Sequence, residues 1–345
     1  MAAFFRVALG VLACLSLWPL EAGAWDRGHV ERFATLPAGA PHPEGIAADS
    51  HGNIYASGFD PVNSAGPGRV FVFDEQGRPV RTLRPAGTSN ALLGMGFNAR
   101  GDLLVLDFGQ GKVFKVNPET GASALFTSVP GNASTGFGLN ALTFDHSGNV
   151  YISDSFQGAI WKTGPNGGAA TIWKQDKLLT TSFPPYGFPP FGANGLQFNS
   201  DESALFVANT GNDTVVTIAN AGGVAGAASV FTNSINGADG LMLDEDDNVW
   251  VCANQADEIV VTDKTGKVIA KIGDFNGVRK GSPVGFLFPA SLVRSGKWVY
   301  VTNLSLDLRP PVTPQQAVDS QWAAQVTINT LSRIPARLPD QDDDD

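Results

Sequence analysis

Short runs of apolar residues alternate with polar turns along nearly the whole chain, and this pattern repeats six times. Each copy has an apolar segment of strand length, a polar turn of the D-x-x-G-N kind, and a second apolar segment that ends in a small polar residue. The first copy reads PEGIAADSHGNIYAS from Pro43, and the third reads LNALTFDHSGNVYISD from Leu139. The residue that enters the first segment recurs at intervals of 49, 47, 54, 45 and 50 residues. This period is typical of one blade of a propeller.

Two further strand-like segments lie between successive copies, such as RVFVFDEQGRPVRTL after the first and EIVVTDKTGKVIAKI after the fifth. The sequence therefore predicts an all-β fold, a six-bladed β-propeller with four-stranded blades. After the sixth pair only VTINTLSRI from Val326 remains, behind a short possible helix over 314–325, whereas HVERFATL precedes the first copy. We expect these N- and C-terminal strands to complete one blade together and so close the ring.

Residues 1–24 have the pattern of a signal peptide. Arg6 supplies a positive charge, residues 7–20 are apolar but too short to span a bilayer as a helix, and residues 22–24 are small, as at a cleavage site. We therefore divide the chain into a signal peptide (1–24), a single propeller domain (25–335) and an acidic, disordered tail (336–345). The expected location is secreted or periplasmic.

Composition narrows the possible partners. The net charge is −10 with a pI near 4.8, and no basic run occurs, so nucleic-acid binding is disfavoured. No later stretch has the apolar length of a membrane helix, so no membrane partner is expected. Cys14 would leave with the signal peptide, and Cys252 would then have no intramolecular disulfide partner. We expect a monomer that acts on a small-molecule substrate.

The repeat should bring polar side chains together at one rim of the ring, because the first strand of a copy runs away from that rim and the second returns to it. We call the residue that enters the first strand the leading position and the residue that leaves the second strand the trailing position. The leading positions are Glu44, Leu93, Asn140, Asn194, Asp239 and Pro289, and the trailing positions include Asp107, Asp154, Asn209, Asn254 and Asn303. Carboxylate and amide oxygens suit calcium or magnesium. The alternative is that these residues only bond local backbone at strand ends.

The pattern resembles the regucalcin and gluconolactonase family, also called the senescence marker protein or LRE-like family, over about 43–303. In that family a Glu ahead of the first blade strand, an Asn of an Asn-Gly pair and an Asp of an Asp-Gly pair bind one metal ion. The resemblance assigns these roles to Glu44, Asn194 and Asp239, and it matches a further Asn that faces the substrate or metal to Asn140. The implied cofactor is one divalent cation. Calcium is expected, and magnesium, manganese and zinc stay open as alternatives.

Two features depart from the relatives. The family often follows its further Asn with an Asp, whereas this chain has Ala141, so one polar contact is expected to be missing. Paraoxonase-like lactonases use a related scaffold with a catalytic His pair and a disulfide, and neither is visible in this sequence.

The resemblance implies a gluconolactonase-like hydrolase, a lactonase or esterase in which the metal polarises the carbonyl group and orients water. Asp239 is the first candidate for the catalytic base and Glu44 is the second, while Asn140 and Asn254 are expected to contact the substrate. The alternative function is that of a non-catalytic, NHL-like propeller that binds a peptide or carbohydrate ligand, because propellers host both kinds of function.

One long segment interrupts the regular spacing. It reads KLLTTSFPPYGFPPFGAN over 177–194 and combines two Pro-Pro pairs with four aromatic residues. We expect it to overhang the predicted site, with Tyr186 and Phe188 contacting the substrate. The alternative is a surface insertion that packs against the neighbouring blade.

The histidines and serines add little catalytic potential. His42 lies two residues before Glu44 and is interpreted either as a general base at the mouth or, more simply, as a structural residue. His51 and His146 fall in the turns at the opposite rim, where we expect surface residues. No G-x-S-x-G motif occurs, so a serine nucleophile is disfavoured.

Overall fold

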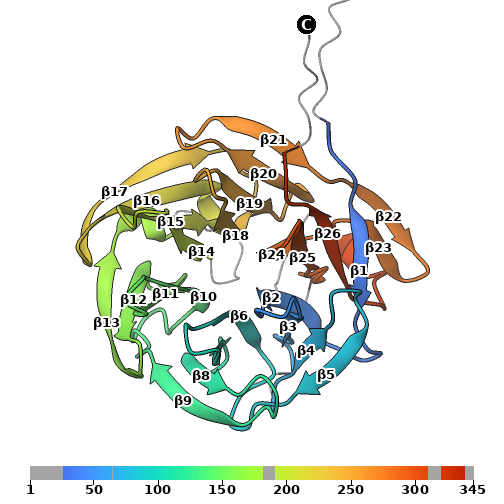
Figure 1. Ribbon diagram of the computed structural model, residues 1–345, viewed down its shortest axis with the longest axis horizontal. Coiled ribbons are helices and arrows are strands. Elements are labelled where there is room, and N and C mark those ends of the chain that lie inside the picture. Colours follow the sequence, from blue (N-terminus) through green and yellow to red (C-terminus); the bar gives the residue numbers. More distant parts are fainter. Residues whose placement is uncertain (1–25, 64, 182–190, 310–319, 339–345) are drawn as a thin grey trace, which may run out of the picture.

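The predicted propeller is present in the structure, a computed structural model that describes residues 26–63, 65–181, 191–309 and 320–338. Six four-stranded antiparallel sheets stand around a central axis (Figure 1). The first three blades are β2 (His42–Ala48), β3 (Ile54–Phe59), β4 (Val70–Phe73), β5 (Pro79–Leu83); β6 (Leu92–Phe97), β7 (Leu103–Asp107), β8 (Lys112–Val116), β9 (Ser123–Ser128); and β10 (Leu139–Phe144), β11 (Val150–Asp154), β12 (Ala159–Gly164), β13 (Gly167–Gln175). The next two are β14 (Ala193–Phe198), β15 (Ala204–Asn209), β16 (Thr214–Ala221), β17 (Val224–Asn233); and β18 (Ala238–Leu243), β19 (Val249–Ala253), β20 (Glu258–Thr262), β21 (Val268–Ile272).

The sixth blade joins the two ends of the chain, as predicted. Its strands are, in order, β24 (Pro289–Ser295), β25 (Trp298–Asn303), β26 (Thr330–Pro335) and β1 (Glu31–Thr35). Across the pairing of β1 with β26, Arg333 Nη2 lies 2.8 Å from Glu31 Oε2. At the axis, Thr302 Oγ1 donates to the carbonyl O of Glu44 at 2.7 Å, which joins the sixth blade to the first.

A few elements lie outside the blades. The hairpin of β22 (Phe275–Arg279) and β23 (Ser282–Gly285) follows the fifth blade, and η1 (Lys177–Leu179) and η2 (Thr210–Asn212) are short 3-10 turns. The helix α1 (Ser320–Ala323) falls inside the stretch predicted as helical, whose residues 314–319 lie outside the described residues, as do the predicted signal peptide and most of the acidic tail. Among the described residues, no helix has the length and apolar character needed to cross a membrane.

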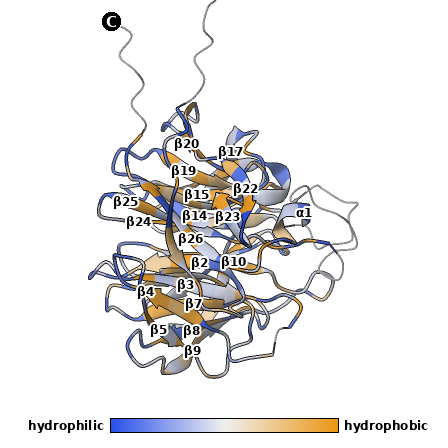
Figure 2. Cartoon of the chain, turned by 90° about the vertical axis from the view of Figure 1, so that its right-hand side faces the viewer, coloured by the Kyte–Doolittle hydropathy of each residue, from blue (hydrophilic) through white to orange (hydrophobic). Residues whose placement is uncertain are grey.

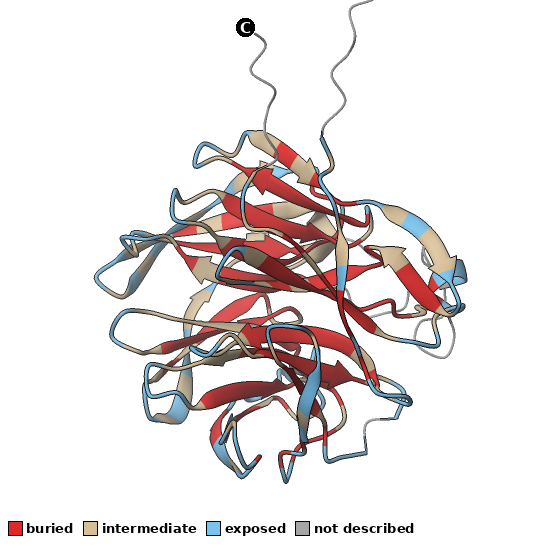
Figure 3. Cartoon of the chain, turned by 45° about the vertical axis from the view of Figure 1, so that its right-hand side comes forward, coloured by how far each residue is buried: buried red, intermediate tan, exposed pale blue. Residues whose placement is uncertain are grey.

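Apolar side chains from adjacent blades pack into shared clusters between them. Tyr55 of the first blade and Leu103 of the second, for example, are fully buried in one such cluster. The apolar residues concentrate in the strands (Figure 2). Exposed residues of all kinds lie mainly in the turns and at the outer edges of the blades (Figure 3). Burial of the alternating apolar side chains is the main stabilising contribution, and Cys252, the cysteine among the described residues, forms no disulfide.

The D-x-x-G-N turns form as their sequence predicts. In the first, Asp49 Oδ1 accepts hydrogen bonds from the backbone N–H groups of His51 and Asn53, both at 2.9 Å, and Gly52 takes the positive φ that the turn requires. His51 is exposed here, and His146 is exposed in the equivalent turn of the third blade, as expected.

Candidate functional site

Every inner strand shifts its register at the same place, beside one rim of the ring. In the first blade the shift lies between Pro43 and Ile46, and the other five blades repeat it. Glycine at the shift lets neighbouring strands approach closely, since a Cβ atom added at Gly45 would lie 2.2 Å from the carbonyl O of Leu93. One cavity of about 320 Å³ lies where the strands converge, and five of the predicted leading residues line it: Glu44, Leu93, Asn140, Asn194 and Asp239.

The leading position predicted for the sixth blade is wrong by one residue. Pro289 pairs with Asn303 as the first ladder pair, so the residue equivalent to Glu44 is Ala290. Ala290 is buried in an apolar cluster, and neither residue lines the cavity. The sixth blade thus supplies no polar side chain from this position.

The prediction for the trailing positions is wrong in four of five cases. Asp107, Asp154, Asn209 and Asn303 each pair with the first residue of their own inner strand, and none lines the cavity. Asn254 differs because the ladder partner in its blade is Ala253, one residue earlier. Side chains alternate between the two faces of a strand, so this single-residue offset turns Asn254 toward the cavity and the other four away from it.

The four trailing residues bond the backbone that leads into their own blade or the next strand, which is the structural alternative stated above. Asp107 accepts from Ser89 N at 2.7 Å, and Asp154 accepts from Gly138 N at 3.0 Å. Asn209 donates to the carbonyl O of Leu178 at 2.8 Å, and Asn303 accepts from Leu287 N at 3.2 Å. Their polarity therefore secures the connections between strands.

Asp239 is held by two amides. Asn254 Nδ2 donates to Asp239 Oδ2 at 2.7 Å, and Asn194 also bonds the Asp239 carboxylate. Burial raises the pKa of Asp239 to about 7, and the hydrogen bonds from Asn254 and Asn194 act in the opposite direction. Asn194 Nδ2 donates to Thr210 Oγ1 at 2.9 Å, and Thr210 in turn donates to the carbonyl O of Ala238. The amide nitrogen of Asn194 is thus occupied, and its Oδ1 is the atom available to a ligand.

Glu44 is the least satisfied polar group of the site. Its side chain is only 4% exposed, and Oε2 is buried without a hydrogen-bond partner. Burial raises the pKa of Glu44 well above its usual range, and the negative charge of Asp239 raises it further. Two buried carboxyl groups therefore oppose each other's ionisation in the absence of a countercharge.

These side chains fit a divalent cation. They offer two carboxylates and the amide oxygens of Asn194 and Asn140, all hard donors, and no described residue that lines the cavity is Lys, Arg or His. The orphaned Glu44 Oε2 is a donor atom in need of a positive partner. The described part of the chain holds no group of three or more His, Cys, Asp and Glu side chains placed to bind a metal ion, so a cation here would depend on amide oxygens as well.

Sequence reasoning missed the apolar half of the cavity. Phe59 and Leu304 each follow the residue that pairs with the inner strand just before the register shift, which is Gly58 in the first blade and Asn303 in the sixth. Thr210 and Asn254 hold the same position in their blades. Correct strand register would therefore have been enough to predict that these residues line the cavity. The remaining apolar lining comes from connections between blades, which carry no repeat: Pro61, Phe191, Phe288, Leu306 and Leu308.

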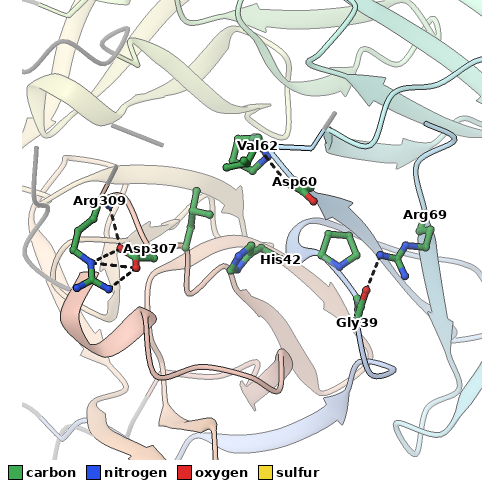
Figure 4. Close-up of a pocket in the computed structure, with 11 residues that line it drawn as sticks. Gly39, His42, Asp60, Val62, Arg69, Asp307 and Arg309 are labelled. Carbon is green, nitrogen blue, oxygen red and sulfur yellow. Dashed lines mark hydrogen bonds and ion pairs between the residues drawn. The ribbon is translucent and has the colours of Figure 1, made fainter. Parts of the chain in front are cut away.

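His42 faces a different cavity. Its Nδ1 lies 2.9 Å from the carbonyl O of Leu304, and its ring lines a neighbouring cavity together with Asp60 and Asp307 (Figure 4). Burial lowers the pKa of His42 despite the bond to Leu304. The structure thus supports the structural interpretation, because His42 does not line the cavity that holds Glu44 and Asp239.

Other predicted contacts have mixed outcomes. Tyr186 and Phe188 lie outside the described residues, so their predicted contact with substrate is untested. Phe191, from the same aromatic segment, does line the cavity. Ala141 follows Asn140 at the register shift and packs beside Gly94 of the second blade, so this position carries no polar side chain.

Comparison with known proteins agrees with this architecture. The model of the SMP-30/gluconolactonase/LRE-like region matches residues 86–273, and no curated protein sequence matches the chain. Similar solved structures include a luciferin-regenerating enzyme, at 16% identity over 89% of this chain and 95% of that chain with a TM-score of 0.63. A gluconolactonase from Xanthomonas campestris has 15% identity over 89% and 90%, with a TM-score of 0.61. The calcium-binding protein regucalcin from Agrobacterium tumefaciens has 14% identity over 88% and 94%, with a TM-score of 0.60. At such identities the likeness shows the fold.

Proposed function

Because the chain belongs to the SMP-30/gluconolactonase/LRE-like family, we propose that it is a hydrolase that uses a divalent cation to open a lactone or a small ester. The observation that carries this proposal is the pair of buried carboxyl groups of Glu44 and Asp239, with Glu44 Oε2 unpaired, on the wall of a cavity of ligand size. The gluconolactonase and the calcium-binding regucalcin among the similar structures support it. Calcium is the proposed ion.

The cation would be held by Glu44, Asn194 and Asp239. When bound, such an ion supplies Lewis acidity for a carbonyl oxygen and lowers the pKa of water. Asn254 fixes Asp239 through Oδ2, so the carboxylate is oriented before substrate arrives. The amide of Asn140 lines the same cavity and can orient the acyl group of the substrate through a hydrogen bond.

Asp239 is the proposed general base. Its carboxylate lines the cavity and is oriented by Asn254, so it can accept a proton from an attacking water bound there. The water oxygen bonds to the carbonyl carbon, the bond from that carbon to the leaving oxygen breaks, and the proton taken by Asp239 passes to the leaving alkoxide. A lactone would thereby become a hydroxy acid.

Hydrolysis of a lactone and aryl ester panel, in calcium and in chelator, tests this function. We expect turnover that is lost in chelator, and we expect Asp239→Asn and Glu44→Gln to lower both kcat/KM and calcium affinity by at least tenfold. Asp154→Asn is the matched control, because Asp154 is a buried rim carboxylate that bonds backbone N–H groups instead of lining the cavity. Full activity of Asp239→Asn in calcium would refute the mechanism, and binding without turnover would favour the non-catalytic alternative.

Export is also part of the proposal. Its support is the positive, apolar and small-residue order of residues 1–24. Mass spectrometry of the protein made with its full N-terminus should find a chain that begins at Trp25 in the exported fraction. An unprocessed chain retained inside the cell would contradict it.

A further inference from the structure

The cavity has two chemically different parts. Its polar part comprises Glu44, Asn140, Asn194, Thr210, Asp213, Asp239, Asn254 and Gln255. A second part is aromatic and aliphatic and includes Phe59, Phe191, Phe288, Leu304, Leu306 and Leu308. We call this set the apolar wall.

Packed rings hold the aromatic part of the apolar wall in place. Phe108 contacts Phe59 edge to face with ring centroids 5.9 Å apart, and it contacts Phe191 at 6.2 Å. Phe156 closes the cluster, at 5.8 Å from Phe108 and 5.6 Å from Phe191. Four rings thus support one another across three blades, so the wall is preformed and would not need to be assembled by a ligand.

The aliphatic part comes from the extended segment after β25. Leu304, Leu306 and Leu308 stand at every second position of this segment. All three leucines line the cavity that holds Glu44, and Leu306 also borders the neighbouring cavity, where Asp307 and Arg309 pair with each other (Figure 4). The charges of Asp307 and Arg309 therefore compensate each other, and neither residue lines the cavity that holds Glu44.

This wall selects against polyhydroxylated ligands. A hydroxyl placed against it would lose water and gain no hydrogen-bond partner, whereas an aryl or alkyl group there would bury apolar surface. We propose, building on the function above, that the substrate is a lactone or ester with an apolar ring or chain, whose carbonyl faces Glu44 and Asp239 and whose hydrocarbon part lies on the apolar wall. Sugar lactones, dense in hydroxyls, are disfavoured.

Binding of hydrolysis-inert lactams tests this proposal separately from catalysis. Calcium-loaded protein is titrated by calorimetry with dihydrocarbostyril, a lactam fused to an aryl ring, and with gluconolactam, its polyhydroxylated counterpart. We expect dihydrocarbostyril to bind at least tenfold more tightly. Equal or tighter binding of gluconolactam, or binding of neither lactam, would overturn the proposal. If dihydrocarbostyril binds and no lactone is hydrolysed, the apolar wall stands and the hydrolase function fails.

Variants connect the preference to the wall. Leu308→Asn puts an amide on the half-buried end of the wall and should weaken dihydrocarbostyril binding about tenfold, while gluconolactam binding stays unchanged or improves. Leu125→Asn is the matched control on the exposed face of β9, outside the cavity, and should leave both unchanged. Phe191→Leu keeps the position apolar and checks ring contact in case Leu308→Asn fails to fold. An unaltered dihydrocarbostyril affinity in both folded variants would refute the wall as the binding surface.

Discussion

The substitution Asp239→Asn should have opposite effects on stability with and without a cation. Burial raises the pKa of Asp239 from 3.8 to about 7, and at about 1.4 kcal/mol per pH unit the ionised form costs the folded protein roughly 4 kcal/mol. At pH values below 3.8 the carboxyl is protonated in both folded and unfolded chains, so this cost is absent. As the pH rises toward 7 the unfolded chain ionises first, and the free energy of unfolding falls.

In chelator, the wild type should therefore lose up to about 4 kcal/mol between pH 4 and pH 8, and the raised pKa of Glu44 acts in the same direction. Asp239→Asn removes one of the two charges and should be the more stable protein at pH 8. The Oδ1 of the new amide can still accept from Asn254. In calcium the order should reverse once the free ion exceeds about a thousand times its Kd, where binding adds about 4.1 kcal/mol to the wild type, because the variant lacks one carboxylate donor.

Urea denaturation gives the free energy of unfolding of both proteins at pH 5 and pH 8, each in chelator and in calcium. Asp154→Asn is the control, because it should lose stability equally with and without calcium, owing to its bonds to backbone N–H groups. The electrostatic account of the site is wrong if the wild type in chelator is as stable at pH 8 as at pH 5. It is also wrong if Asp239→Asn is less stable than the wild type in chelator at pH 8.

Two further predictions concern contacts between the strands that surround the central axis. Thr302→Val removes the buried hydrogen bond to the carbonyl O of Glu44 and should lower the free energy of unfolding by about 1–3 kcal/mol, because it leaves that acceptor unpaired; unchanged urea denaturation would contradict it. Gly45→Ala should also lower it, by about 1–3 kcal/mol or more, since the new Cβ would overlap the backbone of Leu93. Gly164→Ala is the control, with no atom within 4 Å of its added Cβ and no positive φ; an equal effect of both would refute the close-approach argument.

The fold could be predicted because each copy of the sequence repeat corresponds to one blade. The D-x-x-G-N turns fix where the first and second strands meet, and HVERFATL had no partner other than the incomplete sixth blade. The leading residues followed from the same spacing, apart from Pro289. The trailing residues did not, because chemical likeness aligned Asn254 with Asn209, whereas the ladder aligns Ala253 with Asn209. A shift of one residue changes the face of the sheet without changing the apparent motif.

The apolar wall was beyond sequence reasoning for a different reason. Leu306 and Leu308 lie in a connection that occurs once, after β25, and no second copy exists to reveal their orientation. Their neighbours Asp307 and Arg309 make the segment look like an ordinary polar loop. Only the path of the chain shows that the leucines alternate into the cavity that holds Glu44.

The blade that contains both β1 and β26 can form only late in folding, because it needs both ends of the chain. The first five blades each come from one contiguous stretch and can pair locally, whereas Glu31 pairs with Arg333, 302 residues later. Until then β25 and β1 both present unpaired edges, which are sites for aggregation. A chain that ends before Thr330 would have five complete blades and an open ring. The last strand is therefore required to cover the exposed edges and prevent aggregation between molecules.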